Sequence, residues 1–417
     1  MRHARRLLPL FVLTALHASA SSWTLRPAFA AEIGYDDNVF LQDRSALLPA
    51  VANPVPDEAA SGFLKTSASL AATYKAGDSV FTAGYTAELT RYEAFASENH
   101  DDHRLELASR GHSANWSHAF KGSLLVVSGE NTSPAFGHAG GTPAIGGADL
   151  RARRDQAYTK FSGNLTRTLN HGFVRAVTAA NIQDYHTHHL AAPGYANYVD
   201  RAEYTAGLEG ARNVHKDFAL VAAVRGGFQR QADLLGVAQN SSNTLTRVLV
   251  GVEGRPHADL KLAILAGPDF RRYDSTVPAG FDRTRTARYV EASATWTPCK
   301  TDTVTFTAKD YLWLSSGGRL PYQNTAAALA WEHAFTAEWS VTLASDIEVG
   351  DNRDYVLPAS RRCDWIYTGT FTVTRQLGAN TTLDLSLTRE WSDSVIAATP
   401  GREYTRLLTR AGVTHTF

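Results

Sequence analysis

The sequence lacks long apolar runs and an excess of charge of one sign, and it has only two cysteines. After the first twenty residues, no stretch is long and apolar enough for a membrane-spanning helix, which needs about 20 apolar residues. Lysine plus arginine and aspartate plus glutamate both number 41. The chain therefore has no strong basic field, and we expect no nucleic acid as a partner.

Residues 1–20 have the pattern of a signal peptide. Four basic residues precede an apolar stretch that is too short to span a bilayer, and the small residues Ala18-Ser19-Ala20 suit a signal peptidase. A second small-residue site ends at Ala30, but we prefer cleavage after Ala20 because strand-like alternation already begins at Trp23. Cleavage there removes three of the basic residues and leaves a mature domain, 21–417, with an acidic excess of three.

Apolar and polar residues alternate through the rest of the chain, without a linker or a shift in composition. Near its start, one face carries Trp23, Leu25 and Ile33, and the other carries Arg26 and Glu32. A membrane strand has this period of two because one face contacts lipid and the other faces the lumen, whereas a helix would need a spacing near 3.6. The sequence predicts an all-β protein, a transmembrane up-and-down antiparallel β-barrel in the outer membrane of a Gram-negative envelope.

Short turns and long polar loops alternate, as in a barrel with periplasmic turns and external loops. Eight turns and nine loops join about eighteen strands (16–18), and an even number leaves both termini in the periplasm. The alternation slips near Ser113, where a bulge could lie. The turns are expected at 75–78, 120–122, 170–172, 214–217, 256–259, 298–302, 335–338 and 376–380, and the loops at 36–60, 92–102, 131–155, 186–202, 232–245, 274–287, 314–322, 350–363 and 392–403.

Tryptophans lie at both ends of the predicted strands, which is typical of the two aromatic girdles of a membrane barrel. Those beside short turns are Trp116, Trp296, Trp331 and Trp339, and those beside long loops are Trp313, Trp365 and Trp391.

The predicted topology also separates the two cysteines. Cys299 lies in a periplasmic turn and Cys363 at the outer end of a strand. The apolar band between these ends is about 25 Å tall, and a disulfide needs Cα atoms within about 7 Å. Export would permit a disulfide, but this separation predicts that the two cysteines do not pair.

The final strand has Leu407, Val413 and Phe417 on one face. A strand that ends in an aromatic residue resembles the C-terminal signal that barrel-assembly machinery reads. We therefore expect Phe417 to act as an assembly signal, with outer-membrane lipid and this machinery as partners.

The segment from Pro27 to Leu41 includes Tyr35-Asp36-Asp37-Asn38-Val39-Phe40. It resembles the opening of a family of outer-membrane β-barrel porins that is often associated with exopolysaccharide genes. In that family the first strand ends in Tyr-Asp-Asp-Asn-aliphatic-Phe and enters the first outer loop. The resemblance implies a barrel that accompanies exopolysaccharide production and export.

Asp36, Asp37 and Asn38 favour a strand end held by side-chain-to-backbone hydrogen bonds. The alternative, a divalent cation at the rim, lacks an identifiable third ligand. A histidine cluster, His186 with His188 and His189, is more typical of a solvated loop than of a zinc or copper site, because no cysteine or acidic residue has diagnostic spacing. We expect no metal and no cofactor.

Charged residues of both signs fall on the predicted inner face, and a barrel of about eighteen strands is wide enough for a water-filled lumen. Mixed charge suits neutral or weakly selective solutes. The alternative is that these residues pair with one another and only brace the wall. We select as pore-lining Arg175, Arg225, Glu253, Glu291, Lys309, Glu332, Asp384 and Arg410.

Two functional hypotheses follow. The first is a porin-like passive channel, with saccharide or exopolysaccharide passage. The second is a structural or binding barrel, plugged by loops such as 36–60 or 131–155, that acts with polysaccharide export proteins. A barrel hydrolase is less favoured because no nucleophile motif such as Gly-x-Ser-x-Gly occurs, and we expect a protein that is not an enzyme.

Overall fold

The computed structural model describes residues 21–39, 41, 60–129, 155–186, 199–233, 240–274, 281–315, 321–351, 353, 362–396 and 404–417. These residues form eighteen strands and one short 3-10 helix, η1 (Ala96–Glu98). None of the helices within the described residues is long and apolar enough to cross a membrane. The strands are β1 (Ser21–Asp36), β2 (Ser61–Ala76), β3 (Ser79–Tyr92), β4 (His100–Ser113), β5 (Trp116–Gly129), β6 (Gln156–Leu169), β7 (Gly172–Tyr185), β8 (Arg201–His215), β9 (Phe218–Gln231), β10 (Asn243–His257), β11 (Leu260–Tyr273), β12 (Thr284–Cys299), β13 (Asp302–Trp313), β14 (Tyr322–Ala334), β15 (Trp339–Asp351), β16 (Arg362–Gln376), β17 (Thr381–Ile396) and β18 (Tyr404–Thr416).

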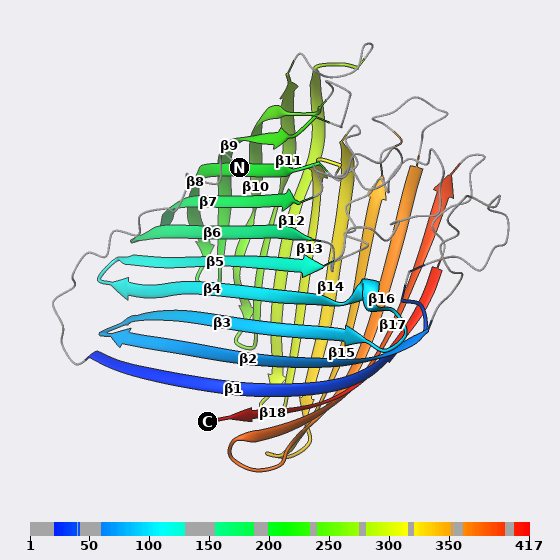
Figure 1. Cartoon of the computed structure of the whole chain (residues 1–417). Coiled ribbons are helices and arrows are strands. Elements are labelled where there is room, and N and C mark those ends of the chain that lie inside the picture. The colour runs from blue at the N-terminus through cyan, green and yellow to red at the C-terminus, as the bar shows by residue number, and fades with distance from the viewer. Residues whose placement is uncertain are drawn as a thin grey trace.

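Each strand pairs in antiparallel fashion with the next one in the sequence, and β18 pairs with β1. The closing register runs from Ala28 opposite Thr416 to Asp36 opposite Leu408. Strands of the near wall cross those of the far wall in Figure 1, as expected for strands that tilt relative to a barrel axis. The predicted closed antiparallel β-barrel and its eighteen strands are confirmed.

The outer face of the barrel exposes large apolar side chains at alternate positions. Trp23 is 69% exposed, Ile33 64% and Val250 65%. Covering a side chain of this size with an apolar medium is worth about 1.5–3 kcal/mol, so many such positions together favour a lipid environment strongly. The polar partners of this alternation point into the barrel.

One predicted turn is wrong. The chain turns at Ala114-Asn115, between β4 and β5, and Ala114 adopts a positive φ of 48°. Phe120 and Gly122, where the turn was predicted, lie inside β5 and pair with Gly163 and Phe161 of β6. The slip in alternation near Ser113 marked this turn and not a bulge.

The prediction for Trp313 is also wrong, because this residue does not face the outer girdle. It lies on the same face as Lys309 and Tyr311, is buried, and its ring is 5.2 Å from the guanidinium of Arg201. Alternation along β13 places this strand-end tryptophan on the inner face, where it fills the interior. By contrast, Trp116, Trp296, Trp339 and Trp391 are exposed on the outer face.

Several predictions fall outside the described residues. They are the signal peptide 1–20, Phe40 of the family-like motif, His188 and His189, and most of the loops 36–60 and 131–155. Cys299 is exposed at the short-turn end of β12, and Cys363 is buried at the long-loop end of β16. Both thiols are free in the structure.

Candidate functional site

The inner wall between β7 and β12 carries an ion-pair cluster, here called the central network. Its cations are Arg175 and Arg225, and its carboxylates are Glu209, Glu253 and Glu291. Glu209 is shared, because it accepts hydrogen bonds from Arg175 at 2.7 Å and from Arg225 at 2.6 Å. Four of these five residues were selected from the sequence as pore-lining, and the structure brings them together.

Arg225 extends the central network to β12. Its two terminal nitrogens donate to Glu291 at 3.0 and 2.6 Å, and the hydroxyl of Tyr289 donates to the same carboxylate at 2.6 Å. Bidentate arginine–carboxylate contacts fix the geometry of both partners. The charged residues here pair with one another and brace the wall, as the alternative interpretation of the inner-face charges predicted.

A second cluster, here called the buried network, lies nearer the long-loop end. Asp269 accepts hydrogen bonds from Arg247 at 3.0 Å and from Arg271 at 2.8 and 2.6 Å. Glu203 lies 3.2 Å from Arg247, and Asn243 accepts from Arg271 at 3.0 Å. Arg247, Asp269 and Arg271 are almost completely removed from solvent. Charges at such depth persist only when they are paired and hydrogen-bonded.

The chain segment Tyr311–Ser315, here called the inward segment, covers the buried network. The carbonyl of Leu314 accepts a hydrogen bond from Arg201 at 2.8 Å, and that of Ser315 accepts one from Gln231 at 2.6 Å. The carbonyl of Leu312 accepts from Gln229 and Arg271. The segment stays paired with β14 as far as Trp313 but no longer pairs with β12, and side chains of β8, β9 and β11 bind its free carbonyls instead, as buried peptide groups require.

An apolar patch lies between the two networks on the inner face of β9–β12. It consists of Val221, Ala223, Leu249, Leu265 and Tyr289, all buried. The ring of Tyr289 also stacks 4.4 Å from the guanidinium of Arg247, which joins the patch to the buried network. One side of the barrel interior is therefore packed like a protein core.

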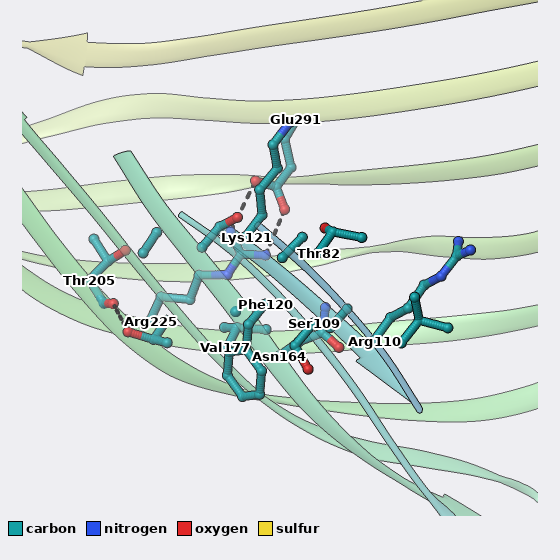
Figure 2. A pocket seen from close by; sticks show the side chains of 17 residues that line it. Thr82, Ser109, Arg110, Phe120, Lys121, Asn164, Val177, Thr205, Arg225 and Glu291 are labelled. Carbon is teal, nitrogen blue, oxygen red and sulfur yellow. Dashed lines mark hydrogen bonds and ion pairs between the residues drawn. The ribbon is translucent and has the colours of Figure 1, made fainter. Parts of the chain in front are cut away.

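Two adjoining cavities lie in the rest of the interior. The first, of about 590 Å³, is lined by inner-face residues of β3–β8 and by Arg225 and Glu291, which meet across it in Figure 2. The second, of about 460 Å³, extends along β4–β8 to Lys309, Tyr311 and Trp313. Both cavities are lined by Lys121, Ser162 and Ala179, so they lie side by side.

The remaining selected residues lie apart from both networks. Lys309 sits 4.3 Å above the ring of Tyr311 in the second cavity. Glu332 lies on β14, and Asp384 on β17 accepts a hydrogen bond from Thr374 at 2.6 Å. Arg410 on β18 reaches Ser386 at 3.4 Å. The structure thus divides the eight selected residues between a paired wall and the rest of the lumen.

Sequence reasoning missed the buried network and Arg201. Side chains an even number of residues apart lie on the same face of a strand. Arg247 therefore shares the face of Glu253, and Asp269 and Arg271 share that of Lys261, so strict alternation could have placed them inside. No such pattern predicts the inward segment, because the side chains that bind its backbone carbonyls are distant from it in the sequence.

The family-like motif closes the barrel at the long-loop end of the β1–β18 seam. Asp36 is buried and accepts two hydrogen bonds from Arg406, at 2.9 and 2.6 Å. Asp37 accepts one from the backbone N–H of Leu407, and the side chain of Asn38 donates to the carbonyl of Thr405 at 2.9 Å. Tyr35 points outward. The predicted side-chain-to-backbone bonds are present, and they join the first strand to the last.

Phe417 lies at the other end of this seam. Its N–H donates to the carbonyl of Pro27 at 2.9 Å, and its ring is 70% exposed and contacts His415 edge-on. The ring makes the outward surface of the last strand end in an aromatic group, which suits an interfacial position.

We expect deletion of Phe417 to reduce outer-membrane insertion far more than His415→Ala, while export to the periplasm continues. The deletion removes the terminal aromatic ring and the last seam hydrogen bond, whereas the substitution keeps both. Membrane fractionation with surface proteolysis measures insertion, and equal outer-membrane levels of wild type and deletion would contradict the assembly role.

The structure places His186 2.7 Å from Asp155. Among the described residues, no group of three or more histidine, cysteine or acidic side chains could hold a metal ion.

No protein-family model matches the sequence, and no curated protein matches it. Among solved structures, the chain is similar to OccK2 (OpdF) of Pseudomonas aeruginosa in complex with glucuronate, with 12% identity over 94% of this chain and 98% of that chain and a TM-score of 0.44. It is also similar to the outer membrane protein OpdK of Pseudomonas aeruginosa (10% identity, 94% and 99% coverage, TM-score 0.43) and to a BenF-like porin of Pseudomonas fluorescens Pf-5 (12%, 94% and 99%, 0.44). These likenesses are too distant to assign this chain a substrate, and the resemblance of residues 27–41 to an exopolysaccharide-associated family stays a prediction.

Proposed function

We propose that this protein is an outer-membrane porin that conducts small solutes passively. The observation that carries the proposal is a closed barrel with an apolar outer face and two adjoining interior cavities whose linings include charged side chains. A closed barrel satisfies every backbone group along its strands without water, which the hydrocarbon core requires. Charged side chains inside the same barrel are stable where water fills the lumen.

The lumen charges indicate how selective the pore is for ions, and they do not identify a solute. Many of the charged side chains form ion pairs within the two networks, so we expect weak ion selectivity. Passage of saccharides or of exopolysaccharide rests on the resemblance of residues 27–41 alone. Liposome swelling with neutral sugars of increasing size would test it, since sugar passage predicts swelling that slows with size.

A second candidate, a plugged barrel in an envelope polysaccharide machine, is favoured by the inward segment. Tyr311–Ser315 has separated from β12, remains paired with β14 as far as Trp313, and its carbonyls are bound by four side chains of other strands. It covers the buried network, however, and the two cavities remain in the rest of the interior.

Reconstitution into planar bilayers separates the two functions. We expect stepwise conductance from purified protein, because two adjoining cavities remain in the interior beside the packed wall. Heat-modifiable gel mobility and a β-dominated circular dichroism spectrum of the same preparation show that it is folded. Silent bilayers with demonstrably inserted protein would contradict the channel and favour the plugged barrel.

A further inference from the structure

One arginine of the lipid-facing surface lies far from both ends of its strand. Arg389 is near the middle of β17 and shares a face with Leu385, Leu387 and Trp391, whose large side chains are exposed on the outside of the barrel. Arg389 is exposed as well, and it makes no salt bridge, hydrogen bond or ring contact with another described residue. The other lysine, arginine and acidic side chains described on this face of the strands lie close to a strand end or form a salt bridge.

Arg389 lies just inside the outer aromatic girdle. Trp391, two residues further along the same face, stacks on Tyr367 of β16 with the ring centroids 5.1 Å apart, and Tyr367 stacks in turn on Trp365. Two residues of a tilted membrane strand correspond to about 5 Å of depth. Arginine side chains snorkel over such distances, so the guanidinium reaches the level of the lipid headgroups on the long-loop side.

The residues beside Arg389 leave room for a ligand. Its register partner on β16 is Gly369, and the partner of Gly369 on β15 is Ser345. A Cβ added at Gly369 would meet no other residue within 4 Å. This row of small residues lies between two rows of large ones, Ile347 and Tyr367 toward the outside and Leu343 and Phe371 toward the periplasm.

An unpaired guanidinium at this depth needs an anion that the protein does not supply. A charge that faces hydrocarbon is costly unless it meets a counter-charge or water. Asp393, the next acidic residue on the same face of β17, lies beyond Trp391 and forms no salt bridge with Arg389. Lipid phosphates are the anions at the level of the girdle, and a guanidinium binds a phosphate through two parallel hydrogen bonds.

We propose that Arg389, Gly369 and the stacked pair Tyr367–Trp391 form a binding site for a phosphorylated glycolipid of the outer leaflet. The guanidinium binds a phosphate, and the aromatic rings contact the sugar that carries it. Leu387 and the neighbouring apolar side chains contact its acyl chains. The site faces lipid and not the lumen, so the inference rests on the outer-membrane barrel and not on the proposed channel function.

The test is binding of bisphosphorylated lipid A to the purified barrel in detergent, measured by native mass spectrometry. For Arg389→Leu, we expect the affinity to fall about ten- to hundredfold, the usual effect of losing a hydrogen-bonded charge. Arg389→Lys keeps the charge without the bidentate geometry and should fall between the two. Lipid A without phosphates should bind wild type and Arg389→Leu equally weakly.

The matched control is Arg375→Leu. Arg375 lies on the same outer surface at the periplasmic end of β16, where it stacks on the ring of Trp339, so its loss should leave the affinity unchanged. Heat-modifiable gel mobility shows that each variant is folded. In phosphatidylcholine vesicles, added lipid A should raise the urea midpoint of wild type and not that of Arg389→Leu.

Three results would overturn the site. The first is equal affinity of wild type and Arg389→Leu for bisphosphorylated lipid A. The second is equally tight binding of phosphatidylglycerol, which would replace the glycolipid by any anionic lipid. The third is a wild-type dimer that Arg389→Leu dissociates, which would make this surface a contact between two copies of the chain.

Discussion

Replacing Asp269 with Asn should lower the free energy of unfolding by about 3–5 kcal/mol, the cost of breaking a buried ion pair from one side. Asp269 is fully buried and is the acceptor for both Arg247 and Arg271. The amide removes the negative charge and leaves two arginines in the interior with one remaining carboxylate, Glu203, beside Arg247. Urea unfolding of protein refolded in lipid vesicles, followed by tryptophan fluorescence, measures the change.

The matched control is Asp274→Asn. Asp274 pairs with Arg230 at 3.0 Å, and both side chains are largely exposed at the long-loop end. Exposed pairs contribute about 0–1 kcal/mol, so this variant should unfold close to wild type. Equal, small losses for both variants would show that water reaches the buried network, and that the inward segment does not seal it.

The architecture could be predicted because its physical cause is local. A strand between lipid and water must alternate, and each short turn or long loop interrupts that alternation where the strand ends. Trp23, Leu25 and Ile33 on one face, against Arg26 and Glu32 on the other, therefore already gave the first strand its orientation. The turn at Ala114-Asn115 was misplaced by a few residues because Phe120 and Gly122 resemble a turn in composition although they lie within a strand.

For the interior, the sequence predicts only which side chains of a strand point inward, and not which of them contact one another. Parity placed Arg225 and Glu291 inside, but not their pairing, which joins β9 to β12 across two intervening strands. Parity also places Trp313 on the inner face, with Lys309 and Tyr311, and the girdle prediction for this residue failed because it considered only the position at a strand end.

The seam between β1 and β18 supports a last prediction, that Asp36→Ala weakens barrel closure by about 3–5 kcal/mol. Asp36 is fully buried, and its two oxygens accept hydrogen bonds from Arg406 and from the backbone N–H of Asn38. The alanine variant leaves the Arg406 guanidinium in the wall with no carboxylate bonded to it. It also removes the cap that holds Asn38 against the carbonyl of Thr405.

A double-mutant cycle with Arg406→Ala isolates the pair. Each single variant removes one partner and should be strongly destabilised, whereas the double variant leaves no uncompensated charge and should recover part of the loss. We expect a coupling free energy of about 1–3 kcal/mol from unfolding in lipid vesicles. Additive losses would mean that backbone pairing alone holds the seam.

The same vesicles treated with a chelator test the rim-cation alternative. Since both Asp36 oxygens are already bonded within the protein, chelation should leave wild-type stability unchanged, and a loss as large as that of Asp36→Ala would instead assign the motif to a bound cation.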